Sequence, residues 1–452
     1  MANELKARVE RFMDRLQRED VCMHGFILSV GGQIKAKAYY PPFEEGQAHR
    51  MYSVSKTMTG LAIGMLMEDG KLNLEDKVTD YFQDWLPAKQ DPQLSRLTIH
   101  HLLRFSTNHR DDTYWQIDDP NWARSYFEVP STHEPGLVFH YDTSATQVLS
   151  ELVRRLSGKE VLDFLEERLF KPAGATDPKH WIRDPEGHCW GGSGLCMSLR
   201  DMHKIARLCM EGGYGIVPEW YLKEMTRLQT PTPLNVNEEE RYGYGLQCWQ
   251  TRSGWAMYGL GAQLAICCPD KDLLLCTIAD TRLDICGVQR VYDAFYDEIE
   301  PWIGKEDMEE TEFIGRINVL PDCGVRKHEH EGPFHFGENA LTLHTLELRG
   351  QEVFLENARG KGVLRFGIGE NIVDTFPGLP DEPTFCSGGW VAPDCLRIRC
   401  YLIGDSPCGV DLVISFGEAD GKKSVCVLSR RSAEPQTDYF EGVATGYQNP
   451  GS

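Results

Sequence analysis

A serine and a lysine stand three positions apart in the stretch Met51-Tyr52-Ser53-Val54-Ser55-Lys56. Residues at this spacing share one face of a helix, so the two side chains can lie within hydrogen-bonding distance. A serine hydroxyl becomes a nucleophile when a base takes its proton, and a partly desolvated lysine can be that base. The pattern predicts an activated serine, Ser53, paired with Lys56. The alternative is a serine that caps a helix, followed one turn later by an exposed lysine.

The residues after Ser53 predict a helix. Gly70 stands where a C-terminal cap belongs. Apolar residues recur between them at the 3.6-residue period: Met58, Leu61, Ala62, Met65 and Leu66. Ser53 would then lie at the helix N-terminus, where free backbone N–H groups and the helix dipole stabilise a developing oxyanion.

Composition and charge restrict the classes of function. The chain has 452 residues, which is more than one ordinary core holds, so two domains are expected. A net charge of −21 argues against nucleic acid and anionic membrane surfaces as partners. No apolar run is long enough to cross a bilayer, and the first residues lack the apolar core of a signal peptide. Fifteen cysteines without an export signal favour a reducing compartment, so a cytoplasmic location is predicted.

The first part of the chain reads as an α+β fold. An amphipathic helix is predicted over residues 5–16 and a hairpin at Gly31-Gly32. Further strands are predicted at residues 244–249, 255–258, 264–268 and 273–278, and a helix at 288–302. Together these elements predict one antiparallel sheet flanked by helices, with a mostly helical insertion between its halves.

The character of the chain changes after a charged run at residues 305–310. Period-two alternation predicts strands at residues 395–402, 410–414 and 424–428, with frequent Gly and Pro between them. We therefore expect a separate all-β barrel or sandwich. The predicted domains are residues 1–304 and 305–452.

A tyrosine element follows in the middle of the chain. Pro135-Gly136-Leu137-Val138-Phe139-His140-Tyr141 precedes an apolar helix at residues 148–156. Together with Ser53 and Lys56, this element resembles the serine β-lactamase and penicillin-binding-protein superfamily. The resemblance favours the class C-like branch of carboxylesterases, D-aminopeptidases and D-alanyl-peptide hydrolases. It extends over about residues 5–303, and the second domain resembles the small lipocalin-like or barrel modules found in some of these proteins.

The resemblance implies a role for each residue. Ser53 attacks a carbonyl carbon and becomes acylated, while Lys56 and Tyr141 act as general base and then general acid. Which of these two is the base in acylation stays open at this point. The backbone N–H groups of Ser53 and Leu260 would form the oxyanion hole. No metal or organic cofactor is implied.

Two positions depart from the superfamily pattern. Thr143 stands where the Tyr-x-Asn element has asparagine, and a hydroxyl cannot present a two-donor amide. Met257-Tyr258-Gly259 aligns with the Lys-Thr-Gly or His-x-Gly element, which helps to bind a substrate carboxylate. Since Met257 cannot bind a carboxylate, true β-lactamase activity is not expected.

Other residues are weaker candidates for substrate binding. Asn108 and Trp115 lie in a long loop-like stretch that also holds Tyr114 and Trp122, and ordinary loop packing is the alternative. His188 and Trp190 flank the Gly-rich residues 191–194. His328-Glu329-His330 hints at metal ligands, but its irregular spacing favours a solvated loop, so no metal site is predicted.

The leading hypothesis is a serine hydrolase that acts on a small-molecule ester or amide through an acyl-enzyme on Ser53. Esters are favoured because the usual carboxylate anchor is missing and an alkoxide leaves with less help than an amine. Three alternatives stay open. They are a D-amino-acid amidase or peptidase, a degenerate member that binds a ligand without turnover, and a protein whose β domain is the main binding module.

Overall fold

The computed structural model describes residues 4–89, 91–302, 309–324, 333–376, 383–404, 409–419, 421–432 and 440–448. The chain forms two compact units: unit 1 is Met1–Ala279 with Cys286–Gly315, and unit 2 is Asp280–Ile285 with Arg316–Ser452. Each unit has its own hydrophobic core.

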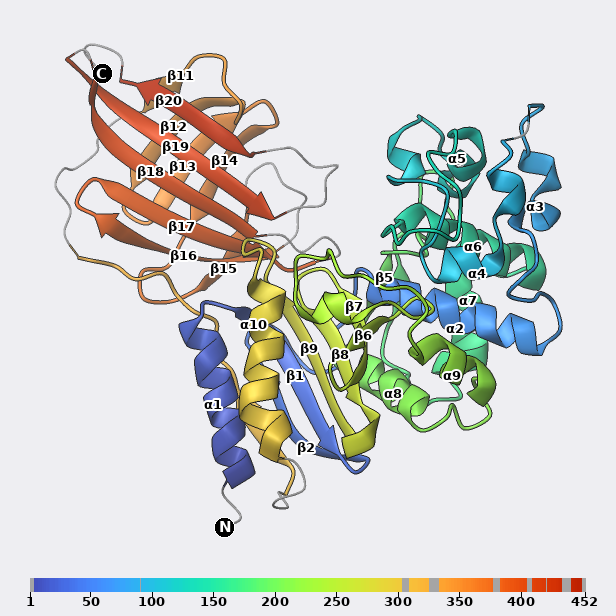
Figure 1. The fold of residues 1–452 in the computed structure, drawn as a ribbon. Helices are drawn as coiled ribbons and strands as arrows, with labels where there is room; N and C mark the ends of the chain where they lie inside the picture. Colours follow the sequence, from blue (N-terminus) through green and yellow to red (C-terminus); the bar gives the residue numbers. More distant parts are fainter. Residues whose placement is uncertain are drawn as a thin grey trace. The chain divides into compact units, whose positions relative to one another are not determined.

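Unit 1 is built on a seven-stranded sheet in the order β10-β2-β1-β9-β8-β7-β6 (Figure 1). Its strands are β1 (Cys22–Val30), β2 (Gln33–Tyr39), β6 (Trp249–Thr251), β7 (Gly254–Gly259), β8 (Gln263–Cys268), β9 (Leu273–Asp280) and β10 (Thr311–Ile314). The β-lactamase-like sheet is confirmed with one correction: it is mixed, because β10 runs parallel to β2. This edge strand lies beyond the predicted domain limit at residue 304 and pairs within unit 1.

The predicted hairpin joins β1 to β2. Gly31 and Gly32 have φ values of 58° and 74°, which a two-residue turn between twisted strands requires and which residues with a side chain rarely adopt. Val30 pairs directly with Gln33 across this turn.

Helices cover both faces of the sheet (Figure 1). On one face, α1 (Glu4–Arg18) packs against α10 (Gly287–Ala294) and the π-helix η7 (Phe295–Ile299) that continues it. On the other face, α2 (Val54–Glu68) contacts β7, and α8 (Leu199–Met210) contacts β1 and β8. Strand β9 is therefore buried along its whole length.

The predicted helical insertion lies between β2 and β6. Its helices besides α2 and α8 are α3 (Val78–Tyr81), α4 (Ile99–Leu103), α5 (Trp122–Glu128), α6 (Thr143–Ser157), α7 (Val161–Leu165) and α9 (Glu219–Thr226). Helix α6 is central, since it contacts α2, α4, α5 and α7. A small sheet in the order β3-β5-β4 completes this region, with β3 (His49–Arg50), β4 (His180–Trp181) and β5 (Leu195–Met197).

One predicted strand of unit 1 is wrong. Residues 244–248 form turns and isolated bridges, and only Trp249 of the predicted strand belongs to β6. The physical reason is local, because Gln247 adopts a φ of 59°, which an extended strand does not accommodate.

Unit 2 is an antiparallel ten-stranded sheet in the order β14-β13-β12-β11-β20-β19-β18-β17-β16-β15. Its strands are β11 (Phe334–Phe336), β12 (Leu343–Arg349), β13 (Glu352–Asn357), β14 (Gly360–Arg365), β15 (Ile372–Thr375), β16 (Pro383–Ala392), β17 (Cys395–Leu402), β18 (Gly409–Ala419), β19 (Lys422–Ser432) and β20 (Gly442–Tyr447). The two edge strands meet, and Arg365 on β14 forms an ion pair of 3.1 Å with Asp374 on β15. The sheet thus curls into a nearly closed barrel. Of the barrel and the sandwich predicted from the sequence, the barrel is confirmed.

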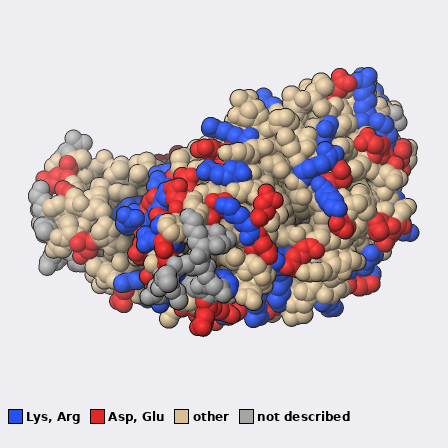
Figure 2. Space-filling view, turned by 60° about the horizontal axis from the view of Figure 1, so that its bottom comes forward, with Lys and Arg blue, Asp and Glu red and all other residues tan. Residues whose placement is uncertain are grey.

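The surface carries charges of both signs. On the face shown in Figure 2, basic and acidic side chains intermingle. Among the described residues, no helix combines the length and the apolar character needed to cross a membrane.

Candidate active site

A tight turn between β3 and α2 presents Ser53. Met51 donates its backbone N–H to the carbonyl of Leu195 on β5 at 2.8 Å, which fixes the end of β3. Tyr52 then adopts a φ of 47°, in the left-handed region that a bulky side chain rarely occupies. Such strain persists only where the surroundings enforce it, and it is found most often at functional sites. The turn places Ser53 at the N-terminus of α2, as predicted.

Ser53 and Lys56 lie within hydrogen-bonding distance. The Lys56 Nζ donates to Ser53 Oγ at 2.9 Å and to the backbone carbonyl of Gly192 at 2.7 Å. Lys56 is only 1% exposed, although it is a cation in water. Burial of this kind disfavours the charged form of an amine, and the two acceptors hold the amine in place.

Tyr141 lies close to Lys56. The Lys56 Nζ is 4.9 Å from the centre of the tyrosine ring. The ring is held by an edge contact with Phe105 at 5.0 Å and by stacking on Trp249 at 5.7 Å. Loss of hydration raises the pKa of the Tyr141 hydroxyl above its ordinary value, and a hydrogen bond with Ser53 partly opposes this shift. Tyr141 is therefore a protonated phenol at neutral pH.

Thr143 is the first residue of α6, directly after this tyrosine element. Its backbone N–H donates to Asp112 Oδ1 at 2.6 Å, and the Ser144 N–H donates to the same oxygen at 3.2 Å. Asp142 caps the helix through the N–H of Ala145. Burial and the neighbouring Asp142 raise the pKa of Asp112 to about 6, while Lys56 acts to lower it.

The Gly-rich segment at residues 191–194 packs against both Lys56 and Thr143. A side chain at Gly192 would have its Cβ only 2.4 Å from Thr143 Cγ2 and 3.4 Å from Lys56 Nζ. Arg50 holds the segment by donating from Nε to the carbonyl of Ser193 at 2.6 Å. Because glycine has no side chain, this backbone can approach both α2 and α6. The sequence motif did not indicate this close approach.

The end of β7 closes the site beside Ser53. A Cβ at Gly259 would lie 2.1 Å from the carbonyl oxygen of Met51, so this backbone packs directly on the Ser53 turn. Gln263 Nε2 donates to the carbonyl of Leu260 at 2.9 Å. Ala262, with a φ of 72°, has its carbonyl held by Thr277 Oγ1 at 2.8 Å. The backbone around Leu260 is therefore fixed next to Ser53.

Met257 and Tyr258 point to opposite faces of β7. Met257 is fully buried in the core of unit 1 and pairs with Ala265 on β8. Tyr258 lies on the other face, half-buried, with its ring 6.5 Å from that of Trp249. The substrate-binding roles expected for Met257 and Tyr258 stay predictions.

Asn108 and Trp115 have different surroundings. Asn108 is fully buried, and its amide is bonded at both ends, to the Tyr126 hydroxyl at 2.8 Å and to Ser131 Oγ at 2.6 Å. These bonds brace the loop, and the substrate-binding role expected for Asn108 stays a prediction. Trp115 is 42% exposed and belongs to a cluster of aromatic rings with Tyr114, Trp122 and Trp190.

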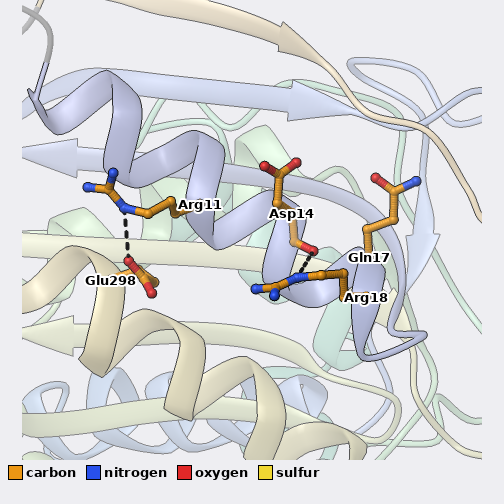
Figure 3. Close-up of a pocket in the computed structure, with 5 residues that line it drawn as sticks. All are labelled: Arg11, Asp14, Gln17, Arg18 and Glu298. Carbon is orange, nitrogen blue, oxygen red and sulfur yellow. Dashed lines mark hydrogen bonds and ion pairs between the residues drawn. The ribbon is translucent and has the colours of Figure 1, made fainter.

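A surface pocket elsewhere in unit 1 is separate from this site (Figure 3). It is lined by Arg11, Asp14, Gln17 and Arg18 of α1 and by Glu298 of η7. These elements cover the sheet face opposite α2. The tripeptide His328-Glu329-His330 lies outside the described residues.

Two residues near the site were not predicted as site residues. Asp112 lies 31 positions before Thr143, and Gln263 reaches Leu260 from the next strand. The fold brings Asp112 to the start of α6, whereas Gln263 and Leu260 are three positions apart in the sequence.

The family follows from comparison with known proteins. The sequence pattern of the family described as Beta-lactamase matches residues 5–281, which is more than half of the chain. This chain belongs to the beta-lactamase family. It is 23% identical over 225 residues to 6-aminohexanoate-dimer hydrolase of Paenarthrobacter ureafaciens, covering 46% of this chain and 57% of the relative. It is 26% identical over 216 residues to esterase EstB of Burkholderia gladioli, covering 41% and 54%.

The chain spans about half the length of these curated relatives. Among solved structures, SurE superposes with a TM-score of 0.54 at 16% identity and covers 89% of this chain and 95% of its own. At this identity the superposition shows a shared fold, which extends beyond the residues matched by the family pattern.

Proposed function

We propose that this member of the beta-lactamase family is a serine hydrolase that cleaves small esters or amides through an acyl-enzyme on Ser53. The observation that carries the proposal is the 2.9 Å contact between Ser53 Oγ and the buried Lys56 amine. Two relatives support it, since one is named a dimer hydrolase and the other an esterase.

Lys56 is the base in the first step of the proposed reaction. The ordinary pKa of a tyrosine is about 10, and that of Tyr141 is raised, so at neutral pH it has no ionised oxygen to accept the Ser53 proton. Lys56 in its neutral form accepts that proton as Ser53 Oγ bonds to the carbonyl carbon of the substrate. The backbone N–H groups of Ser53 and Leu260 stabilise the oxyanion that forms.

Tyr141 is the acid in the second step. Its hydroxyl lies beside Ser53 and gives a proton to the leaving alkoxide or amine as the acyl-enzyme forms. The Lys56 ammonium then returns a proton to Tyr141. In deacylation, water attacks the acyl carbon and Lys56 takes a proton of the water. The Lys56 ammonium gives that proton to Ser53 Oγ as the bond between Oγ and the acyl carbon breaks and the acid product leaves. Every proton is carried by these side chains or by water.

The substrate is proposed to lack an obligatory carboxylate. At the position where the superfamily pattern has a lysine or histidine, Met257 is apolar and fully buried. An ester without a carboxylate anchor fits this site better than a penicillin does, because Met257 offers no charge to pair with an anion.

The test is covalent labelling followed by intact-mass spectrometry. Wild type is exposed to a fluorophosphonate and, separately, to a simple penicillin. Two variants accompany it: Ser53→Ala and the control Ser95→Ala, which removes an exposed serine hydroxyl. We expect a single fluorophosphonate adduct on wild type and on Ser95→Ala, none on Ser53→Ala, and no penicillin adduct.

The alternatives make different predictions in the same experiment. Folded wild-type protein that reacts with neither reagent would favour a degenerate binding protein. Turnover of D-amino-acid amides in preference to esters, lost in Ser53→Ala, would favour an amidase or peptidase.

A further inference from the structure

Asp112 occupies a position that the proposed reaction does not explain. Its Oδ1 accepts the N–H groups of Thr143 and Ser144 at 2.6 Å and 3.2 Å, and its Oδ2 accepts the Tyr114 hydroxyl at 3.2 Å. The carboxylate therefore sits at the positive end of α6, where the helix dipole and free N–H groups favour an anion.

Thr143, to which Asp112 is bonded, lies near Lys56. Thr143 and Lys56 meet at Gly192, since a Cβ built there would be 2.4 Å from Thr143 Cγ2 and 3.4 Å from Lys56 Nζ. Asp112 is bonded to the backbone of this same Thr143. Thr143 thus lies against both Asp112 and the Gly192 backbone that holds the Lys56 amine, and Lys56 acts to lower the pKa of Asp112.

Several elements contribute groups that surround the Lys56 amine. Ser53 belongs to the same helix, and Tyr141 precedes α6. The Gly-rich segment offers the neutral carbonyl of Gly192.

A second carboxylate, that of Asp142, is a neighbour of Asp112. Asp142 is fully buried and accepts the Thr107 hydroxyl at 2.8 Å and the Ala145 N–H at 3.1 Å. The hydroxyl of Ser144 is bonded to it as well. Asp142 is therefore held by its own set of donors, and Lys56 acts to lower the pKa of Asp112.

We propose that Asp112 is a positioning residue of this site, which holds the start of α6 and places a negative charge beside the Lys56 amine. The proposal rests on the proposed function, because it concerns the protonation of the base. A negative charge stabilises the ammonium form, so Asp112 makes Lys56 release its proton at a higher pH than it otherwise would. Removing only the charge should let Lys56 act as a base at lower pH.

The sharpest variant is Asp112→Asn. Its side-chain oxygen can still accept the N–H groups of Thr143 and Ser144, and its amide can donate to the Tyr114 oxygen. The helix cap is thus kept while the charge is removed. Asp112→Ala removes both, and Asp111→Asn removes a neighbouring charge whose side chain is 72% exposed.

The first measurement is the pH dependence of kcat/KM for a neutral p-nitrophenyl ester. We expect the acid limb in Asp112→Asn to move to lower pH by at least about half a unit, which is less than the shift of 1 to 3 units seen for charges in direct contact. Asp111→Asn should match wild type. Asp112→Ala should show the same shift and also a kcat about tenfold lower, because the start of α6 loses its anchor.

The second measurement does not require turnover. The pKa of the Lys56 amine is followed by NMR of protein labelled with ¹³Cε-lysine, with Lys56→Arg to assign the signal. A lower amine pKa in Asp112→Asn supports the proposal. Unchanged values, or an equal change in Asp111→Asn, would overturn it. Absence of Ser53-dependent turnover in wild type would instead count against the proposed function and leave this second measurement intact.

Discussion

The Ser53 site of unit 1 and the barrel of unit 2 use opposite means to hold side chains in place. At the site, buried polar and charged groups such as Lys56 and Asp142 are fixed by specific hydrogen bonds, and Tyr52 is held in a strained conformation. In the barrel, regular ladders place apolar side chains inward, as Leu396 and Ile398 on β17 show.

The side chains at the Ser53 site are the ones proposed to do chemistry, whereas the apolar side chains inside the barrel provide stability. A buried amine and a strained turn cost free energy of folding, and the surrounding structure must offset that cost. Apolar side chains inside a barrel contribute stability through burial alone. Changes at the site should therefore alter rates, and changes in the barrel should alter the free energy of unfolding.

The largest effect is expected from Tyr141→Phe. Without the phenol proton, a poor leaving group loses about 10²- to 10⁴-fold in kcat, the range typical of general acid catalysis. A p-nitrophenyl ester should lose much less, because p-nitrophenolate leaves without protonation. The measurement is kcat for an alkyl ester and for a p-nitrophenyl ester of the same acid. An equal loss for both esters would mean that Tyr141 does not act as the acid.

The next effect is expected from Gln263→Met. The Gln263 amide holds the carbonyls of Leu260 and Ala279, and a thioether would leave both without their donor. We expect kcat to fall about 10- to 100-fold with a smaller change in KM, since an oxyanion donor acts mainly in the transition state.

The control for this change is Gln250→Met. Gln250 also lies on a strand and donates to a backbone carbonyl, that of Thr226 at 3.1 Å, but it belongs to β6 and pairs with Trp255 at the end of β7 remote from Gly259. Equal losses of kcat in both variants would indicate a general loss of sheet order instead of a displaced oxyanion donor.

The smallest effect on the rate is expected from Ile398→Ala in the barrel. Ile398 is fully buried, so truncation should lower the free energy of unfolding of unit 2 by about 2 to 5 kcal/mol. Calorimetry measures the loss of stability, and ester turnover at a temperature where the variant is folded should match wild type. A fall in kcat with folding intact would show that the barrel influences the site, and the comparison above would no longer hold.

The sequence allowed the local parts of this structure to be predicted. The contact of Ser53 with Lys56 follows from helical spacing, and the hairpin at Gly31-Gly32 follows from turn chemistry. Strand β17 (Cys395–Leu402) was predicted with its limits, because its side chains alternate strictly. Tyr141 needed the family resemblance, since nothing in its own neighbourhood indicates a partner on α2.

The remaining parts depend on contacts between distant residues. Asp112 contacts Thr143 from 31 positions earlier in the chain, and Gly259 packs against the carbonyl of Met51. The parallel pairing of β10 with β2 likewise joins residues from opposite ends of unit 1. Spacing along the chain contains no information about such contacts.

The burial of Lys56 also has a consequence for the chemical lifetime of the protein. A neutral amine reacts with the aldehydes and acyl phosphates of metabolism, which would acylate or alkylate it and end its use as a base. Here the amine is 1% exposed and rests against the Ser53 hydroxyl and the Gly192 carbonyl. An electrophile that enters from solvent therefore meets the half-buried Ser53 oxygen first, where an acyl group forms an ester that water can remove. Under the proposed mechanism, an acylation that would be permanent on the amine becomes one more turnover on the serine.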